Sequence, residues 1–339
     1  MNRLSRRSFL STSAALAVAP SISAAPRPQL GQGDFQYRVI PDWGVLDHDT
    51  PVKNCSAMVT DARGRIYLLT DHVKNNIIIY QEDGTLAGKW GNQFPGAHGL
   101  QIIKDQGREM LFITDIKRHR VFKTTLDGEV VMELTYPKQT GKYTNETEFR
   151  PSWTLHLTNG DFFVLDGYGK DYIMRYNRAG KLLNIFGGTD GGIAHWGPHG
   201  GTIDTRGPGE DELLIAMSDQ QTIKRLTLDG NLIQEVKLPG SNPRMIQIVG
   251  DHMFVPHLAD NWPKDRNSRG YISVLDRNFQ VIANIGGTAP KYVDGRLQPM
   301  REQGGIFRHP HDLVVASDGA IYVPQFASGS TYPIKLEQI

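Results

Sequence analysis

Short apolar segments recur along the chain in pairs, and the pairing repeats six times. Within each pair a turn rich in glycine and polar residues separates an apolar segment from a second one that mixes aromatic and aliphatic residues. The pairs are 56–61 with 66–69, 98–103 with 110–113, 152–157 with 162–165, 199–203 with 213–216, 244–249 with 253–255, and 311–315 with 321–323. Segments this short, bounded by turn residues and rich in β-branched and aromatic side chains, predict β-strands.

A third apolar segment follows most of these pairs, at 77–80, 120–123, 172–176, 223–226 and 271–275. Hairpin turns such as Asp83-Gly84 and Asp127-Gly128 then lead to a fourth segment, since Asp-Gly accepts the positive φ of a tight turn. The turn glycines at 84, 128, 180 and 230 are 44, 52 and 50 residues apart, which is the length of a four-stranded propeller blade with its loops. The sequence therefore predicts an all-β fold, a six-bladed β-propeller with four-stranded blades.

The sixth repeat has no room for a fourth strand, because the chain ends at Ile339. Segment 35–40, which precedes Trp43-Gly44, has the character of that missing strand. We expect this N-terminal strand to complete the last blade and close the ring, which would remove an open sheet edge. Residues 26–339 would then form a single domain.

The first 25 residues have the features of an export signal. Ser5-Arg6-Arg7-Ser8-Phe9-Leu10 precedes a mildly apolar run that ends in Ser23-Ala24-Ala25, the small residues that a signal peptidase requires. We expect residues 1–25 to be a twin-arginine signal peptide that engages the twin-arginine export machinery. The mature protein would be periplasmic or secreted, with no membrane association after cleavage.

Composition excludes several other classes of protein. The formal net charge is +1 with scattered charges, which argues against a nucleic-acid or anionic membrane partner. Cys55 is the only cysteine, so no intramolecular disulfide can form. The sequence contains neither a glycine-rich phosphate loop nor a Gly-x-Ser-x-Gly elbow.

Histidine opens every second repeat of the expected ring. His98, His199 and His311 occupy the first position of repeats two, four and six, where the other repeats have Ser56, Ser152 and Arg244. Alternate blades of a six-fold ring lie about 120° apart around one axis. Three imidazoles that converge with an open fourth position are the ligands of a catalytic zinc site, so we expect Zn²⁺ or another divalent transition metal there.

The segments His98-Gly99-Leu100, Asp166-Gly167-Tyr168 and His311-Asp312-Leu313 resemble the NHL-type repeats of the peptidylglycine α-amidating lyase family, and the likeness extends over most of the chain after residue 25. It implies that the three histidines bind zinc and that Tyr168 is catalytic, as a general base beside the ion. It also implies a structural Ca²⁺ held by the backbone carbonyls of Met58 and Leu100 and the carboxylate of Asp312. Oxygen-only ligands suit such a hard cation.

Two arginines of that family are absent from this chain. Asp71-His72 and Gln220 stand at the corresponding places, which argues against peptide amidation itself. Arg244 could supply positive charge near the metal instead, and His257 and His72 lie on loops expected at the same end of the axis as Tyr168. We therefore include Arg244, His257 and His72 with Tyr168 among the catalytic candidates.

These observations favour an exported, zinc-dependent lyase or hydrolase that acts on a small polar substrate. Trp153, Trp196 and Trp262 could form apolar walls of its pocket, and the polar insertion at 261–270 could shape the mouth. The alternative is a non-catalytic binding or scaffold propeller with a structural metal, since fold does not imply function. A calcium-dependent lactonase-type propeller is a third possibility. Such a propeller would use carboxylate and amide ligands at the axis, whereas this chain places histidines there. Oligomeric state is not predicted.

Overall fold

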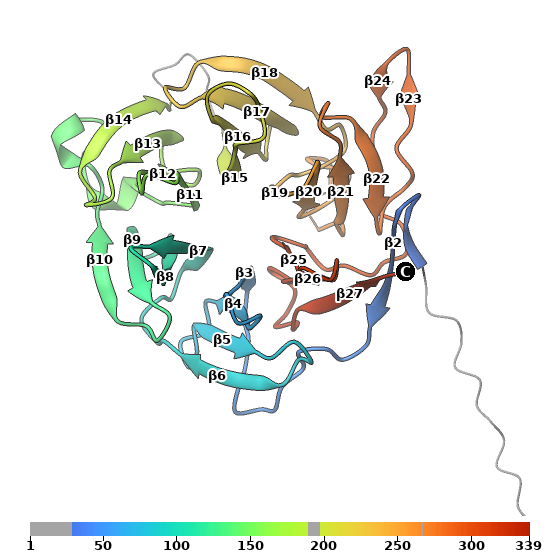
Figure 1. The fold of residues 1–339 in the computed structure, drawn as a ribbon, viewed down its shortest axis with the longest axis horizontal. Coiled ribbons are helices and arrows are strands. Elements are labelled where there is room, and N and C mark those ends of the chain that lie inside the picture. The colour runs from blue at the N-terminus through green and yellow to red at the C-terminus, as the bar shows by residue number, and fades with distance from the viewer. Residues whose placement is uncertain (1–28, 189–196, 266) are drawn as a thin grey trace, which may run out of the picture.

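The computed structural model describes residues 29–188, 197–265 and 267–339. Their strands form six sheets in a ring and one separate two-stranded hairpin, and the strand that opens each sequence repeat lies nearest the central axis (Figure 1). The predicted all-β, six-bladed propeller is confirmed. The expected signal peptide lies outside the described residues, and none of the helices described is long and apolar enough to cross a bilayer.

Blades one to five each contain four antiparallel strands in chain order. Blade one comprises β3 (Cys55–Thr60), β4 (Ile66–Thr70), β5 (Ile77–Tyr80) and β6 (Leu86–Trp90). Blade two comprises β7 (Ala97–Asp105), β8 (Arg108–Asp115), β9 (Arg120–Thr125) and β10 (Val130–Leu134). Blade three comprises β11 (Trp153–His156), β12 (Phe162–Leu165), β13 (Tyr172–Tyr176) and β14 (Leu182–Gly187). Blade four comprises β15 (Pro198–Asp204), β16 (Glu212–Met217), β17 (Thr222–Thr227) and β18 (Leu232–Lys237). Blade five comprises β19 (Gln247–Val249), β20 (His252–His257), β21 (Tyr271–Leu275) and β22 (Val281–Ile285).

Blade six is built from both ends of the described chain. It orders β25 (Val314–Val315), β26 (Ile321–Val323), β27 (Ile334–Gln338), β2 (Phe35–Ile40) and β1 (Gln29–Gln32) from the axis outwards. β2 pairs with β27 in antiparallel register, with Tyr37 opposite Gln338 and Val39 opposite Leu336. The predicted closing strand is therefore observed, while β1 adds a fifth strand that the sequence pattern did not predict.

Insertions between blades were also not predicted. The short helices η1 (Lys138–Thr140) and η2 (Glu146–Glu148) connect blade two to blade three. A hairpin of β23 (Tyr292–Val293) and β24 (Arg296–Leu297) extends outward between blades five and six (Figure 1).

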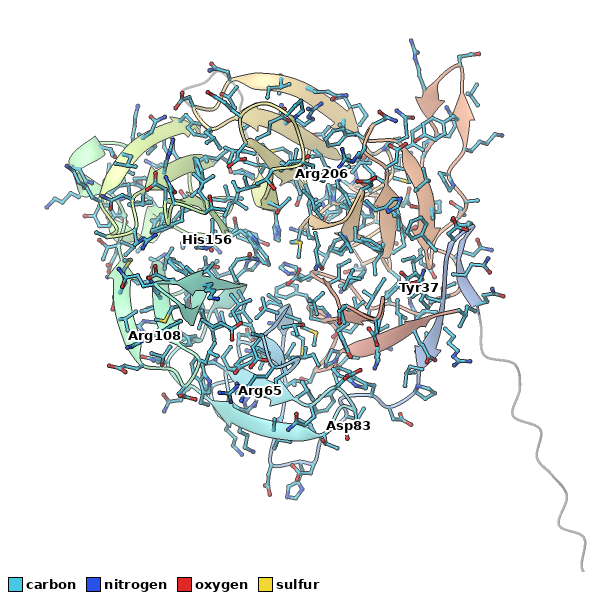
Figure 2. All side chains as sticks on the ribbon, viewed as in Figure 1. Tyr37, Arg65, Asp83, Arg108, His156 and Arg206 are labelled. Atoms are coloured by element: carbon cyan, nitrogen blue, oxygen red, sulfur yellow. The ribbon has the colours of Figure 1, made fainter. Side chains whose placement is uncertain are left out.

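The core lies between neighbouring blades. Every side chain of β4 and of β5 is buried, because the middle strands of a blade pack on both faces, whereas the outer strand β6 is largely exposed. The closing strand contributes Tyr37, which Figure 2 labels and which is 1% exposed. Tyr37 packs in one cluster with Ile285 of blade five and Leu336 of blade six. Hydrophobic burial therefore supports the backbone pairing that closes the ring.

Candidate metal centre and catalytic site

β-Bulges place two of the three candidate metal ligands, His98 and His199. In blades one, two and four the pairing of the innermost strand shifts register between Cys55 and Ala57, between Ala97 and Gly99, and between Pro198 and Gly200. The extra residues at these shifts are Ser56, His98 and His199. Because a bulge leaves one residue out of the ladder and re-aims its side chain, this position is redirected in the same way in blades one, two and four.

His98, His199 and His311 form one compact group. The centroids of their rings are 4.9 Å apart for His98 and His199, 4.7 Å for His98 and His311, and 4.8 Å for His199 and His311. One ring nitrogen from each lies within 4.8 Å of the others, and all three residues are buried. The predicted convergence of the three histidines is thus observed.

Each histidine is oriented by the next blade. The Nδ1–H of His98 donates to the carbonyl of Ser152 (2.9 Å), that of His199 to the carbonyl of Arg244 (2.8 Å), and that of His311 to the carbonyl of Ser56 (2.7 Å). A carbonyl only accepts, so the proton of each neutral ring is assigned to Nδ1 and a lone pair remains on each Nε2. Backbone carbonyls of the repeats that lack an axial histidine therefore orient the histidines of the neighbouring repeats.

These lone pairs lack matching donors. Tyr168 Oη lies 3.2 Å from Nε2 of His98 and 3.1 Å from Nε2 of His199, but one hydroxyl proton serves only one of them at a time. Nε2 of His311 is buried without any hydrogen-bond partner among the described residues. Burial lowers the pKa of all three imidazoles, that of His98 to about 4, and the positive charge of Arg244 lowers them further. Three neutral imidazoles whose Nε2 lone pairs share a single hydroxyl proton fit a divalent transition metal.

A short loop of blade three presents Tyr168 to the histidines, and Asp166 holds that loop. The Asp166 carboxylate accepts hydrogen bonds from the backbone N–H of Arg150 (2.6 Å) and of Lys170 (2.7 Å) and from the hydroxyl of Tyr143 (2.7 Å). Asp166 is fully buried, and burial raises its pKa to about 7. Sequence reasoning did not single out Asp166 or Tyr143, although Asp166 opens the motif that it quoted.

Two glycines let this loop pack closely. A Cβ on Gly167 would overlap the carbonyl of Pro198 in blade four, and one on Gly169 would overlap the Asp166 carboxylate and the carbonyl of Glu148. The segment Asp166-Gly167-Tyr168-Gly169 is therefore a compact support, and its two small residues bring Tyr168 near the axis.

Two arginines lie beside Tyr168. A guanidinium Nη1 of Arg244 lies 3.5 Å from Tyr168 Oη, and the guanidinium of Arg150 is 5.8 Å from the centre of the Tyr168 ring. Burial raises the pKa of the Tyr168 phenol, and both guanidinium groups oppose that increase. Arg244 thus lies where the sequence placed positive charge, while Arg150 was missed because no repeat position marks it.

A pocket of about 280 Å³ adjoins this group. Its lining includes Tyr168, His199, Asp219, Arg244 and Trp262. Trp262 therefore forms a wall as expected, whereas Trp153 is fully buried in the core and Trp196 lies outside the described residues.

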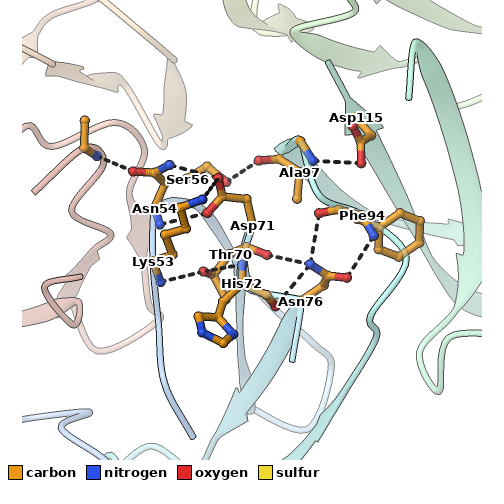
Figure 3. A network of polar contacts seen from close by, with 12 residues as sticks. Lys53, Asn54, Ser56, Thr70, Asp71, His72, Asn76, Phe94, Ala97 and Asp115 are labelled. Atoms are coloured by element: carbon orange, nitrogen blue, oxygen red, sulfur yellow. Dashed lines mark hydrogen bonds and ion pairs between the residues drawn. The ribbon is translucent and has the colours of Figure 1, made fainter. Parts of the chain in front are cut away.

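The structure does not bring His257 or His72 to this pocket. His257 is fully buried in blade five, where its Nε2 hydrogen-bonds to Ser273 Oγ at 2.8 Å, and burial lowers its pKa to about 3. His72 belongs to a polar network of blade one in which Asp71 accepts hydrogen bonds from Asn54 (Figure 3). Position on a loop after the second strand was too coarse a signal to place either side chain.

Two of the three expected calcium ligands, Met58 and Asp312, meet at the junction of blades one and six, whereas Leu100 belongs to β7 of blade two. Asp312 is fully buried, and its carboxylate accepts hydrogen bonds from the backbone N–H of Met58 (3.0 Å) and of Leu313 (2.8 Å). No ion pair with Asp312 is found in the described part of the chain, and burial raises its pKa well above the usual range. A buried carboxyl without a cationic partner fits a hard cation such as Ca²⁺. The carbonyl of Leu100 accepts a hydrogen bond from the side chain of Gln101.

Comparison with known proteins identifies relatives among lyases. No family model matches the sequence. Peptidyl-α-hydroxyglycine α-amidating lyase 1 of Drosophila melanogaster is 33% identical over 261 residues, which cover 71% of this chain and 45% of the relative. Lyase 2 of the same organism is 28% identical over 275 residues, which cover 78% of this chain and 61% of the relative. The chain thus spans about half the length of these curated relatives.

Solved structures resemble the chain in fold. Virginiamycin B lyase from Staphylococcus aureus superposes with a TM-score of 0.54 and 16% identity, covering 90% of this chain and 88% of that one. At this identity the likeness concerns the propeller fold. The sequence comparison carries the family resemblance, and the chain is similar to the peptidyl-α-hydroxyglycine α-amidating lyases, as its His-Gly-Leu, Asp-Gly-Tyr and His-Asp-Leu segments predict.

Proposed function

We propose that this protein is an exported, metal-dependent lyase that acts on a small polar substrate at the three-histidine site. One observation carries the proposal: three buried imidazoles, each fixed by a backbone carbonyl, direct unprotonated Nε2 atoms at one point beside a pocket. The similarity to amidating lyases supports a lyase over other activities that a propeller can host.

The metal ligands, the general base and the residues that position the base and the substrate are different side chains. His98, His199 and His311 would hold Zn²⁺ or a similar ion, which when bound supplies a positive charge that polarises a substrate oxygen and favours phenolate at Tyr168. Tyr168 is the general base, because its Oη is the only side-chain hydroxyl described within hydrogen-bond distance of two of the histidines. Asp166 and Tyr143 hold the Tyr168 loop, and Arg244 orients the substrate.

A structural Ca²⁺ at Met58, Leu100 and Asp312 and twin-arginine export complete the proposal. The Ser5–Leu10 motif supports export, and export of a folded protein suits a metalloprotein that is loaded before it leaves the cytoplasm.

Metal analysis of the purified protein tests the proposal. We expect about one transition-metal ion per chain by mass spectrometry, as a three-histidine site would hold. His199→Ala should remove this ion, because two imidazoles seldom retain a structural or catalytic zinc. Calcium content, measured in the same samples, should be unaffected by this substitution.

His48→Ala is the matched control, since His48 is an exposed histidine whose side chain is 91% accessible. It should retain the full metal content. A protein from the native export route that contains no transition metal would contradict the lyase proposal and favour a binding propeller.

A further inference from the structure

Phe326 packs against two of the three axial histidines. Its ring is stacked on that of His311, with centroids 4.6 Å apart and planes at 29°, and it meets the ring of His98 at 72° and 6.0 Å. The Phe326 side chain is half-buried, so part of the ring covers the imidazoles while another part remains exposed. An apolar ring in this place keeps water away from the imidazoles that it covers.

The pocket beside the histidines lies across the axis from this contact. Its lining belongs to blades three, four and five and includes Tyr168 and His199, whose rings are 5.6 Å apart. Among the described residues, neither Phe326 nor His311 lines the pocket. The site is therefore open on the side of Tyr168 and covered on the side of Phe326.

The Phe326 ring covers the sector of the site that belongs to blade one. Blade one lies between blade six, which carries His311, and blade two, which carries His98 (Figure 1). The axial residue of blade one, Ser56, has a short side chain that hydrogen-bonds to backbone carbonyls of blades one and two. Cover for the two histidines in this sector therefore depends on the larger ring of Phe326.

The loop after β26 holds the Phe326 ring in place. Phe326 donates its N–H to the carbonyl of His309 (3.0 Å), and Nδ1 of His309 lies 3.1 Å from the carbonyl of Phe326. Ala327 donates its N–H to Oδ1 of Asn54 (3.2 Å), a blade-one side chain that also bonds to Asp71 (Figure 3). Ala327 has a φ of 47°, which is uncommon for a residue with a side chain. Contacts to two blades maintain this backbone conformation, as is typical of functional sites.

We infer that Phe326 is a positioning residue of the three-histidine site. Its ring closes the sector between His311 and His98 to water, so that ligands approach through the pocket beside Tyr168. The apolar surroundings of a metal site control both solvent access and the local dielectric, and a lower dielectric strengthens charge interactions in the site. The positioning of a substrate rests on the proposed function, whereas the closure rests on the contacts of Phe326 alone.

Carbethoxylation of the chelator-treated protein measures this closure, because diethyl pyrocarbonate acylates a neutral imidazole at an accessible ring nitrogen. In the wild type we expect His199, which lines the pocket, to react and His311 to remain protected. Phe326→Ala should raise the rate of acylation of His311 about tenfold, because the ring that covers it is gone, while His199 reacts as before. Mass spectrometry of peptides locates each modified histidine.

Three further variants show whether the apolar ring is responsible. Phe326→Leu keeps most of the apolar bulk and should leave His311 nearly as protected as in the wild type, and Phe326→Val should lie between Leu and Ala. Phe186→Ala is the matched control, since it removes another half-buried phenylalanine, on the outer strand β14, and should change none of the axial histidines. Thermal unfolding of each variant checks that it folds.

Two results of the acylation experiment would overturn the inference. One is an unchanged rate at His311 in both Phe326→Val and Phe326→Ala. The other is an equal rise at His199 in these variants, because a general loosening of the fold would expose both histidines alike.

Removal of zinc from the zinc-loaded protein by excess EDTA is a second readout. We expect Phe326→Ala to lose zinc about tenfold faster than the wild type, because water and chelator reach the site from a second side. Equal rates of zinc loss would contradict the inferred closure.

The two readouts also separate this inference from the proposed function. A protein that binds no transition metal would contradict the proposed function, but faster acylation of His311 in Phe326→Ala would still support the closure. A protein that binds zinc, and in which His311 remains unreactive in Phe326→Ala, would overturn the inference and leave the proposed function standing.

Discussion

Buried neutral imidazoles occur both at the axis and away from it, and their hydrogen bonds separate the two groups. Each axial histidine uses Nδ1–H on a backbone carbonyl and leaves Nε2 for a ligand. His257 instead hydrogen-bonds through Nε2 to Ser273 Oγ, which itself donates to Asn284 Oδ1. Its ring is thus held inside blade five as part of a structural polar chain.

His257 should make the stability of the protein depend on acid. Its folded pKa of about 3 lies below the value of about 6.5 for an exposed histidine, so the unfolded chain binds the proton more readily. Stability is therefore complete above about pH 6.5 and falls as the pH drops toward 3, by about 1.4 kcal/mol per pH unit for this residue. Urea unfolding at pH 7.5, 6.0 and 5.0 measures the slope.

His257→Gln should reduce that slope by about 1.4 kcal/mol per pH unit below pH 6.5, because glutamine can still donate to Ser273 but does not titrate. The exposed control His48→Ala should leave the slope unchanged. A slope in His257→Gln equal to that of the wild type would show that His257 does not contribute to acid sensitivity.

The loop between β12 and β13 shows how an element prepares a functional side chain. The Asp166 carboxylate accepts hydrogen bonds from two backbone N–H groups and from the Tyr143 hydroxyl. Because Gly169 has no side chain, it leaves the space that the Asp166 carboxylate occupies. The φ of Gly169 is not positive, so space alone requires glycine at this position.

Gly169→Ala should therefore destabilise the protein by about 1–3 kcal/mol, the usual cost of forcing extra atoms into a packed site. Gly209→Ala is the matched control, because no atom lies within 4 Å of its added Cβ and its φ is not positive. It should change stability by less than about 0.5 kcal/mol. Equal unfolding free energies for the two variants in urea would mean that the loop yields without cost.

The strand pattern could be predicted from the sequence because each repeat carries its own apolar periodicity and turn residues, as at Asp83-Gly84. The Tyr168 support could not be predicted in full. Tyr143 belongs to the connection between blades two and three that contains η1 and η2 and follows no repeat pattern. No spacing in the sequence therefore relates Tyr143 to Asp166. Likewise, Arg244 was located by repeat position, but its contact with Tyr168 of blade three emerges only when the blades are assembled into the ring.

At the scale of the whole molecule, six-fold symmetry explains why the axial site was predictable and why the outer features were not. Histidines that open every second repeat converge on the axis once the ring closes, because the first strand of each repeat lies at the axis in every blade. The fifth strand β1 and the β23–β24 hairpin break that symmetry, so a repeat-based prediction omits them. The site thus depends on closure, because Ser56 of blade one orients His311 of blade six.

Closure can be weakened selectively at β2. Tyr37 packs between blades five and six, and Tyr37→Ala should lower the unfolding free energy by about 3–5 kcal/mol, as for other large aromatic core residues. Arg38→Ala on the same strand removes an exposed ion pair with Glu337 and should cost less than about 1 kcal/mol. Because the ring positions Ser56 against His311, we also expect Tyr37→Ala to lose bound transition metal at a lower urea concentration than Arg38→Ala. Metal release that follows the same urea dependence in both variants would mean that the three histidines stay together without the closing strand.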